Sequence, residues 1–402
     1  MKTAIVVVDS PVDHDRRVTA MIVDLRAANF KIEIVDARCP AVSPGATAII
    51  RASLWCLVSG IEVMAANVLR LGAYFKFWKE ARVSRYNYPL LVNYFQEARM
   101  MIVAVYRGHL HRLLSTRRPD LVVANDLLAG AFARAMLRNL AKTRLYYDAH
   151  EFSPFRNRDN NSVARVAANL VVECWVARGS FRMACVSQAI RDASAALYAL
   201  TRVDYVPNAY YAESHEPEGG IDPALPLHIV YFGAPAAGRG LQLLGKIAEQ
   251  DKSLKVTLFV PEFLDFHESL EGLKALPNVR VRPGMDYESE MLNMLKQQST
   301  VLSWCVIEDL CLSYRMAEPS KFHQSLMFGL PVIVAENQHL ATFVKIDGNG
   351  MVIPQADLES AVASLACIRR ELDQKHQTIG RAAIRVWENS SCFPGWEWPD
   401  IQ

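Results

Sequence analysis

The sequence of 402 residues lacks several features that define common protein classes. Its 8 cysteines show neither a Cys-x-x-Cys spacing nor histidines at zinc-finger spacing, which argues against a disulfide framework or a zinc site and favours the reducing cytoplasm. The 44 Lys and Arg nearly balance the 42 Asp and Glu, so the net charge of +2 is too small for a dedicated nucleic-acid binder. With 51% hydrophobic and 21% charged residues, the composition is that of a globular α/β enzyme rather than a disordered chain.

Long uninterrupted hydrophobic runs are also missing. We interpret the first apolar run as a strand rather than a signal peptide, because it is short and ends at Asp9. Residues 52–69 are apolar, but Gly60, Glu62 and Asn67 interrupt them. Because a spanning helix needs about 20 mostly apolar residues, and a charge in its middle is costly, no transmembrane segment is predicted.

Short apolar runs rich in β-branched residues alternate with amphipathic helical segments along the chain, which predicts parallel sheets covered on both faces. In the first series, the predicted strands are Ala4–Val8, Ile32–Val35, Leu121–Ala124, Leu145–Tyr147, Met183–Val186 and Asp204–Val206, and the predicted helices are Asp15–Ala28, about 91–115, Leu127–Leu140, Val163–Ala177 and Gln188–Leu200. In the second series, the strands are Ile229–Phe232, Val256–Val260, Val279–Arg282, Val301–Trp304 and Val332–Ala335, and the helices are Leu241–Glu249, Glu288–Gln297, Lys321–Phe328 and Asp357–Leu372.

The length and this alternation predict two doubly wound, Rossmann-like domains that face a cleft. Residues 207–227 are rich in proline and glycine and predict a linker. We therefore expect one domain over residues 1–206, with a basic and aromatic insertion around 45–118, and a second domain over 228–375.

Basic residues concentrate between residues 70 and 118, interleaved with tyrosine, phenylalanine and tryptophan. This composition suits peripheral contact with an anionic membrane, where each nearby Lys or Arg contributes roughly 1 kcal/mol. A core helix followed by a solvated, arginine-rich helix is the alternative. Both interpretations stay open.

A glycine-containing turn in the second domain predicts an anion site. The strand Ile229–Phe232 ends at Gly233, and Gly238, Arg239 and Gly240 open the next helix. Backbone N–H groups at a helix N-terminus bind anions, and an arginine can contact phosphate with two N–H groups. An ordinary turn with a surface arginine is the alternative. The spacing is not Gly-x-Gly-x-x-Gly, so it does not support a nicotinamide cofactor.

A second segment, residues 318–334, also predicts an anion site. Pro319 and Ser320 predict a helix start with Ser320 as N-cap and Lys321 in the first turn. A cation there opposes the helix dipole, which is typical of a residue that holds an anion. Gln324 lies one turn later on the same side. A surface lysine in an ordinary helix is the alternative.

Together these segments resemble the family 4 retaining glycosyltransferases of the GT-B fold, in the pattern of bacterial exopolysaccharide and lipopolysaccharide sugar transferases. The resemblance covers most of the chain except about residues 40–115. The segments that carry it are DRRV at 15–18, PDLVVANDLLAG at 119–130, LYYDAHEF at 145–152, ACVSQAI at 184–190, VPNA at 206–209, Gly233 with Arg239–Gly240, and PSK at 319–321 with GLPV at 329–332.

The resemblance implies that the first domain binds the acceptor, that the second binds the nucleotide sugar, and that residues 376–402 cross back to the first domain. Arg239 and Lys321 would stabilise the departing diphosphate, with the N–H groups of 238–240, and His150 would contact the transferred sugar. The implied donor-binding residues are Gly233, Gly238, Gly240, Glu318, Ser320 and Gln324, and the implied acceptor-binding residues are Asp15, Arg16, Asn125, Asp126 and Glu151. For Asp126, a helix N-cap role is the alternative, and for His150 a structural role.

No metal or other cofactor is expected. The triplet Asp13-His14-Asp15 lies in the first loop, too early for the metal site of the other major transferase fold, and Arg239 and Lys321 would supply the positive charge at the diphosphate.

Three positions depart from the family pattern. Gln324 stands where the family has a glutamate, Met316 where it has a second glutamate, and Ala234 where it has a second arginine. Glu318 is one candidate to replace the missing carboxylate, and the pair 308–309 is another. A retaining transferase acting on a glycan or lipid-linked acceptor at the cytoplasmic membrane face is the leading hypothesis. A non-catalytic glycan-binding scaffold and a nucleotide-sugar 2-epimerase are the alternatives.

Overall fold

The computed structural model describes residues 2–9, 12, 15–37, 104–105, 107–108, 118–137, 142–156, 163–208, 226–261, 267–284, 289–290, 301–336, 338–355 and 357–367. The chain divides into two compact units and passes from one to the other between Val206 and Pro207. Nearly all of the insertion around 45–118, most of the linker 207–227 and the segment 376–402 lie outside the described residues, as do most of the helices predicted at 91–115 and Glu288–Gln297.

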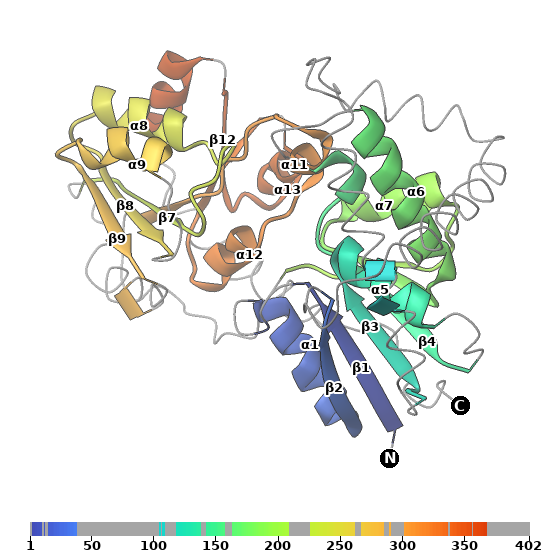
Figure 1. Cartoon of the computed structure of the whole chain (residues 1–402). Helices are drawn as coiled ribbons and strands as arrows, with labels where there is room; N and C mark the ends of the chain where they lie inside the picture. Colours follow the sequence, from blue (N-terminus) through green and yellow to red (C-terminus); the bar gives the residue numbers. More distant parts are fainter. Residues whose placement is uncertain are drawn as a thin grey trace. The chain divides into compact units, whose positions relative to one another are not determined.

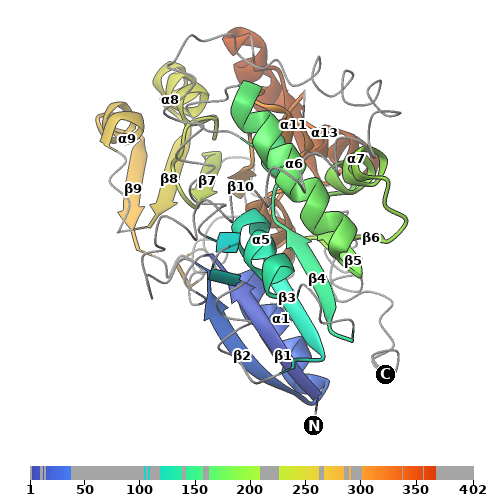
Figure 2. The same cartoon turned by 45° about the vertical axis from the view of Figure 1, so that its right-hand side comes forward.

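The first unit is built on a six-stranded parallel sheet (Figures 1 and 2) in the order β2-β1-β3-β4-β5-β6. Its strands are β1 (Lys2–Val8), β2 (Phe30–Asp36), β3 (Leu121–Asn125), β4 (Arg144–Ala149), β5 (Arg182–Cys185) and β6 (Val203–Tyr205). Its helices are α1 (Arg16–Ala27), α5 (Asp126–Met136), α6 (Val163–Gly179) and α7 (Gln188–Tyr198), with a short 3-10 turn at Ser153–Phe155.

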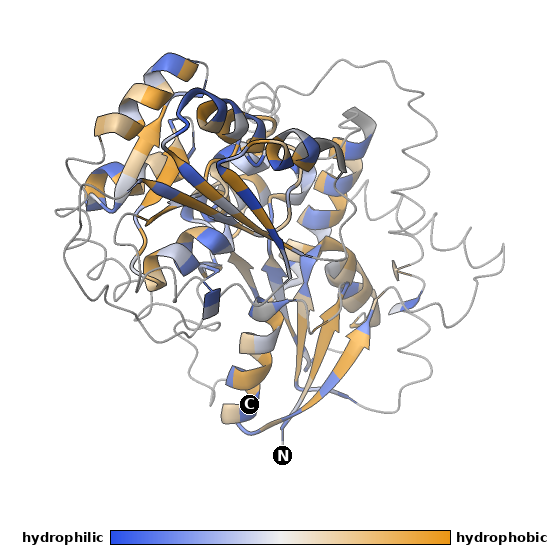
Figure 3. Ribbon diagram, turned by 90° about the vertical axis from the view of Figure 1, so that its left-hand side faces the viewer, coloured by the Kyte–Doolittle hydropathy of each residue, from blue (hydrophilic) through white to orange (hydrophobic). Residues whose placement is uncertain are grey.

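Successive side chains of these strands face opposite layers of the unit. On one face, Val18 and Met21 of α1 belong to the same hydrophobic core as Tyr146 of β4. On the other face, the hydroxyl of Tyr147 donates to Glu173 of α6, and α5 and α6 pack together. Both faces of the sheet are thus covered by helices, which explains why the strands are hydrophobic along most of their length (Figure 3).

The second unit repeats this architecture with the strand order β12-β11-β10-β7-β8-β9, again parallel throughout. The strands are β7 (His228–Phe232), β8 (Lys255–Val260), β9 (Val279–Pro283), β10 (Val301–Trp304), β11 (Val332–Ala335) and β12 (Gly350–Ile353). The helices are α8 (Leu241–Gln250), α9 (His267–Lys274), α12 (Ser320–Met327) and α13 (Leu340–Asp347), and residues 358–367 are also helical. The short helix α11 (Leu312–Met316) belongs to this unit from Tyr314 onward, and its first two residues belong to the first unit.

The prediction of two doubly wound domains is confirmed, and every predicted strand is present. Four elements that lie wholly or partly in the second unit were not predicted: α9, α11, α13 and β12. Each has eight residues or fewer, too short for a clear hydrophobic period. In the first unit, α5 ends at Met136 rather than at Leu140. Among the described residues, no helix combines the length and hydrophobicity needed to cross a membrane.

Each sheet has one point at which the strand order changes direction. In the first unit the chain runs outward from β1 to β2 and then returns to form β3 on the other side of β1. In the second unit it runs outward from β7 through β8 to β9 and then returns to form β10 on the other side of β7. Doubly wound folds bind ligands at the carboxyl ends of the strands that flank such a point. Both groups of predicted site residues lie at these points.

Candidate functional site

Lys321 lies in the first turn of α12 and is buried, with 6% of the residue exposed. Its ammonium is 4.3 Å from the centre of the Tyr231 ring and makes no hydrogen bond to any described residue. Burial, and next the positive charge of Arg239, lower the pKa of Lys321 to about 7. A buried amine without a hydrogen-bond acceptor is costly unless a ligand supplies one, so the interpretation of Lys321 as a surface lysine is wrong.

The loop between β7 and α8 depends on glycine at three places. Gly233, Gly238 and Gly240 all have positive φ, at 122°, 81° and 67°, a region that glycine adopts without steric cost. Gly240 also lies close to its neighbours, since a Cβ there would be 2.6 Å from Cγ1 of Val306. The carbonyl oxygen of Gly238 accepts a hydrogen bond of 2.9 Å from the Glu308 N–H. The loop is therefore held in one conformation.

Arg239 of this loop places its guanidinium 5.0 Å from the centre of the Tyr314 ring. Its charge contributes to the lowered pKa of Lys321, and both residues follow strands of the same parallel sheet, at the carboxyl edge of β7 and β10. Helices α8 and α12 both begin without a side-chain cap on their first N–H groups. Two cations and two uncapped helix N-termini at one edge of the sheet form a site suited to an anion.

Two details of the predicted anion site are corrected. The N-cap of α12 is Pro319, and Ser320 is the first helical residue, because Pro319 has extended backbone angles and its side chain cannot cap. The N–H of Arg239 donates a hydrogen bond to the carbonyl oxygen of Ala236 at 3.3 Å, so this one of the three predicted N–H groups already has an acceptor within the loop.

Gln324 and Glu318 both lie in or beside α12 and are buried. The two carboxylate oxygens of Glu318 face two imidazoles, at 3.6 Å from Nε2 of His323 and 3.5 Å from Nε2 of His339. The sequence analysis missed both histidines, and no spacing signal connects Glu318 with His339 on a different helix. The predicted contacts of Gln324 and Glu318 with a donor stay predictions.

At the corresponding point of the first unit, three carboxylates surround His150. Nε2 of His150 is 3.1 Å from Asp148, and Nδ1 is 3.6 Å from Asp15 and 4.0 Å from Asp126. Burial by itself lowers the pKa of His150, but the charges of Asp126 and Asp148 and the hydrogen bond to Asp148, together with Asp15, raise it to about 9. His150 is therefore a cation at neutral pH.

Arg17 completes this cluster, although the sequence analysis singled out Arg16 instead. The side chain of Arg17 is buried and binds both carboxylate oxygens of Asp148. Burial raises the pKa of Asp148, but the charges of Arg17 and His150 outweigh it and hold the pKa well below its usual range. The sequence contained one indication of this role. Arg17 precedes Met21 by four residues and Leu25 by eight, which places it on the same buried face of the helix.

Asp15 caps α1, since its carboxylate accepts from the N–H groups of Arg17 and Val18, and its partly exposed side chain still faces His150. Arg16 begins α1, and its side chain lies outside the described residues. The partly exposed carboxylate of Glu151 pairs with Arg156 at 2.7 Å.

Asn125, rather than Asp126, occupies the N-cap position of α5, and its side chain makes no capping bond; its Nδ2 donates to the Val7 carbonyl oxygen at 3.3 Å. The N-cap interpretation of Asp126 is therefore wrong. Asp126 is the first residue of α5 and has a φ of 68°, which costs a non-glycine residue energy and is frequent at functional sites. Its carboxylate accepts a hydrogen bond from the backbone N–H of His150.

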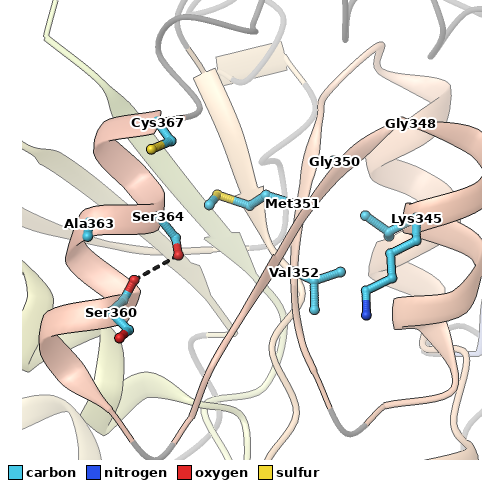
Figure 4. A pocket seen from close by; sticks show the side chains of 10 residues that line it. Lys345, Gly348, Gly350, Met351, Val352, Ser360, Ala363, Ser364 and Cys367 are labelled. Atoms are coloured by element: carbon cyan, nitrogen blue, oxygen red, sulfur yellow. Dashed lines mark hydrogen bonds between the residues drawn. The ribbon is translucent and has the colours of Figure 1, made fainter.

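No metal site is found among the described residues: no group of three or more His, Cys, Asp or Glu side chains there is arranged to hold a metal ion. Asp13 and His14 lie outside the described residues. Metal independence stays a prediction. A cavity of about 550 Å³ opens among β12, α13 and the helix 358–367 (Figure 4). Its lining includes Lys345, Met351, Ser364 and Cys367 but none of the predicted site residues.

Comparison with known proteins gives one family match, which lies in the first unit. Residues 16–209 match the family model described as a glycosyl transferase 4-like domain. The search of curated proteins found no match.

Solved structures similar to the chain share its fold of two parallel-sheet units, the GT-B fold. Sucrose-phosphate synthase from Thermosynechococcus elongatus is 13% identical with a TM-score of 0.62, over 100% of this chain and 96% of that one. HepE from Anabaena, in complex with UDP, is 10% identical with a TM-score of 0.57, over 97% and 96%. An α,α-trehalose-phosphate synthase (UDP-forming) from Burkholderia vietnamiensis is 11% identical with a TM-score of 0.57, over 100% and 97%. The family match and the fold together support a glycosyltransferase of the GT-B type.

Proposed function

We propose that this chain is a retaining glycosyltransferase that moves a sugar from a nucleoside-diphosphate donor to a hydroxyl of a glycan or lipid-linked acceptor, in cell-surface polysaccharide synthesis. The observation that carries the proposal is Lys321, a buried amine without a hydrogen-bond partner among the described residues, beside Arg239 and two uncapped helix N-termini. The structures of HepE with UDP, and with UDP and glucose, support this class of donor.

The chemistry of the transfer explains why cations are needed. As the bond from the anomeric carbon to the diphosphate oxygen breaks, its electron pair passes to the diphosphate. The acceptor oxygen forms a bond to the same carbon, and the proton of the acceptor hydroxyl passes to the departing diphosphate oxygen. Fixed cations and helix N-termini that are aimed at the developing charge lower this barrier without reorganising. Arg239 and Lys321 would supply that charge, and we propose that no metal ion is required.

The cluster around His150 would serve the other reactants. A charged imidazole donates hydrogen bonds from both ring nitrogens, so His150 would donate to a hydroxyl of the transferred sugar while Asp148 holds its second nitrogen. Asp15 and Asp126 are partly exposed and can accept from acceptor hydroxyls. The composition of residues 70–118 supports an acceptor presented at the cytoplasmic face of a membrane.

The direct test is release of nucleoside diphosphate from a panel of nucleotide sugars, with and without a chelator. We expect Arg239→Ala and Lys321→Ala each to reduce turnover by about 100-fold, whereas Lys246→Ala, which removes an exposed lysine of α8, leaves it unchanged. Nucleotide binding without turnover in the native protein would instead indicate a non-catalytic scaffold, and appearance of an epimerised free nucleotide sugar would indicate a 2-epimerase.

A further inference from the structure

Each of the two cations of the second unit lies over its own tyrosine ring. The ammonium of Lys321 is 4.3 Å from the centre of the Tyr231 ring, and the guanidinium carbon of Arg239 is 5.0 Å from the centre of the Tyr314 ring. Both tyrosines are buried. A cation over a ring face is stabilised by roughly 2 kcal/mol when water is excluded. The two rings therefore fix where the cations lie.

The same tyrosines also hold the loop that carries Arg239. The hydroxyl of Tyr231 donates to the carbonyl oxygen of Ala234 at 2.5 Å, near the start of the loop. The hydroxyl of Tyr314 donates to the carbonyl oxygen of Ala237 at 3.4 Å, near its end. A Cβ on Gly238 would be 2.7 Å from Cε2 of Tyr314, so the ring packs directly against the loop backbone. One tyrosine thus holds each half of the loop.

A cation held over an aromatic ring keeps its charge and its N–H donors available, whereas a cation in a salt bridge does not. Within the part of the chain that the structure describes, neither Lys321 nor Arg239 pairs with an acidic side chain. A carboxylate partner would neutralise the cation and occupy the N–H donors that a diphosphate needs. The face of a ring attracts the cation but accepts no conventional hydrogen bond, so the charge and the donors remain available to a ligand.

We propose that Tyr231 and Tyr314 are positioning residues of the diphosphate site, each holding one cation and one half of the loop so that Lys321 and Arg239 reach the same ligand. This proposal rests on the proposed function. It adds two residues that the family motifs do not include and assigns different parts of each side chain to different tasks: the ring to the cation, the hydroxyl to the loop.

Conservative and non-conservative variants separate the two tasks. Inorganic pyrophosphate serves as the probe, because it tests the diphosphate site without knowledge of the base, and its binding to the full chain is measured by calorimetry at pH 6.5. We expect Tyr231→Leu and Tyr314→Leu to weaken binding at least tenfold. Tyr231→Phe and Tyr314→Phe keep the rings and lose only the hydroxyl bonds to the loop, so they are expected to weaken binding by no more than about threefold. Thermal unfolding of each variant establishes that it is folded.

A second readout does not depend on any ligand. NMR of ¹³C-labelled lysine follows the titration of Lys321 in the free protein, with Lys321→Gln identifying its signal. The charged or titratable groups that face Lys321 are the guanidinium of Arg239 and the buried thiol of Cys305, and neither is changed. Removal of the ring in Tyr231→Leu withdraws support from the ammonium, so the midpoint should fall, whereas Tyr231→Phe should leave it unchanged.

The outcomes are distinguishable. If folded Tyr231→Leu binds pyrophosphate like the native protein and Lys321 titrates unchanged, the positioning role is refuted while the proposed function stands. If the native protein binds neither pyrophosphate nor any nucleoside diphosphate, the proposed function fails. The lysine titration then still decides whether Tyr231 supports the cation.

Discussion

Arg17 binds the carboxylate of Asp148 through both of its oxygens, with Nε 2.7 Å from Oδ2 and a terminal nitrogen 2.5 Å from Oδ1. Both side chains are buried. The other terminal nitrogen of Arg17 donates to the carbonyl oxygen of Val206, the last residue before the chain leaves the first unit. Asp148 in turn lies 3.1 Å from Nε2 of His150. Arg17 therefore orients the carboxylate that orients the histidine.

Asp148→Asn is expected to lower the pKa of His150 from about 9 toward its ordinary value near 6.5. The substitution keeps the shape of the side chain but removes one of the negative charges that favour the imidazolium. Titration of the His150 ring signal by NMR measures the change. Glu151→Gln is the control, because it removes a nearby carboxylate that pairs with Arg156. An unchanged midpoint in Asp148→Asn would contradict the assignment.

Arg17→Leu is expected to destabilise the first unit by about 3–5 kcal/mol, because it leaves Asp148 as a buried charge without its main partner. Urea unfolding measures the loss. Arg26→Leu, at an exposed position of the same helix, is expected to have little effect. Equal stabilities of the two variants would mean that the pair of Arg17 and Asp148 does not stabilise the unit.

The affinity for a nucleotide sugar should fall as the pH rises above about 7. The pKa of Lys321 is about 7 in the free protein, so the amine loses its proton above that pH, and a neutral amine attracts the diphosphate far less than an ammonium. The diphosphate of a nucleotide sugar does not itself titrate in this range. Binding near pH 8 should therefore take up a proton, which calorimetry in buffers of different ionisation enthalpy detects.

Lys321→Gln should bind more weakly and without this pH dependence. A native protein whose affinity is constant from pH 6 to 9 would contradict the role of Lys321.

The architecture could be predicted from the sequence because a parallel sheet leaves a strong pattern. Strands buried on both faces appear as continuous apolar runs, such as Val301–Trp304 and Val332–Ala335, and all the predicted ones are present. The short strand β12 has two partly exposed residues between two buried ones and begins with Gly350, so it lacked that signal. Among the side chains of α9 that the structure describes, residues 270–274, the two buried ones are Leu270 and Leu273.

Site residues could be predicted where a sequence motif contains a residue of the required chemistry. Their contacts with residues from distant elements could not be predicted. Lys321 was found because a cation opposes the dipole of its own helix. Its burial and its contact with Tyr231 follow from the tertiary structure, since Tyr231 lies 90 positions earlier in the sequence and on another element. Arg17 differs, because its helical spacing to buried residues was visible and its neighbour Arg16 was chosen on the family pattern alone.

Gly240→Ala is expected to destabilise the second unit by about 2 kcal/mol or more and to weaken diphosphate binding. A φ of 67° strains alanine by roughly 1–2 kcal/mol, and the new Cβ would lie 2.6 Å from Val306 and 3.1 Å from Trp304. Thermal unfolding and calorimetry measure the two effects. Gly272→Ala is the control, since Gly272 lies within α9 with no atom within 4 Å of the added Cβ, and alanine favours a helix over glycine by up to 1 kcal/mol. Equal stabilities of the two variants would contradict the strain.

Glu173 is a carboxyl group in the interior of the first unit, fully buried between two tyrosines. The hydroxyls of Tyr147 and Tyr198 donate to its two oxygens at 2.8 and 2.6 Å. Burial raises the pKa of Glu173 to about 7, although the hydrogen bonds from the tyrosines oppose the shift. The folded protein therefore holds a proton here that the unfolded chain, with an ordinary pKa near 4.5, has already lost at pH 6.

This difference predicts how stability depends on pH. The contribution of Glu173 is fully present below about pH 4.5, is lost as the pH rises through about 7, and amounts to about 3 kcal/mol over that window. Glu173→Gln keeps the shape and both hydrogen bonds, because a tyrosine hydroxyl can accept from the amide, but it cannot ionise. We expect the free energy of unfolding of the native protein, minus that of Glu173→Gln, to decrease from pH 4.5 to pH 8 in urea titrations. Glu249→Gln, at an exposed position of α8, should show no such trend. Parallel pH curves for the native protein and Glu173→Gln would show that the carboxyl group of Glu173 is already ionised in the folded state at acidic pH.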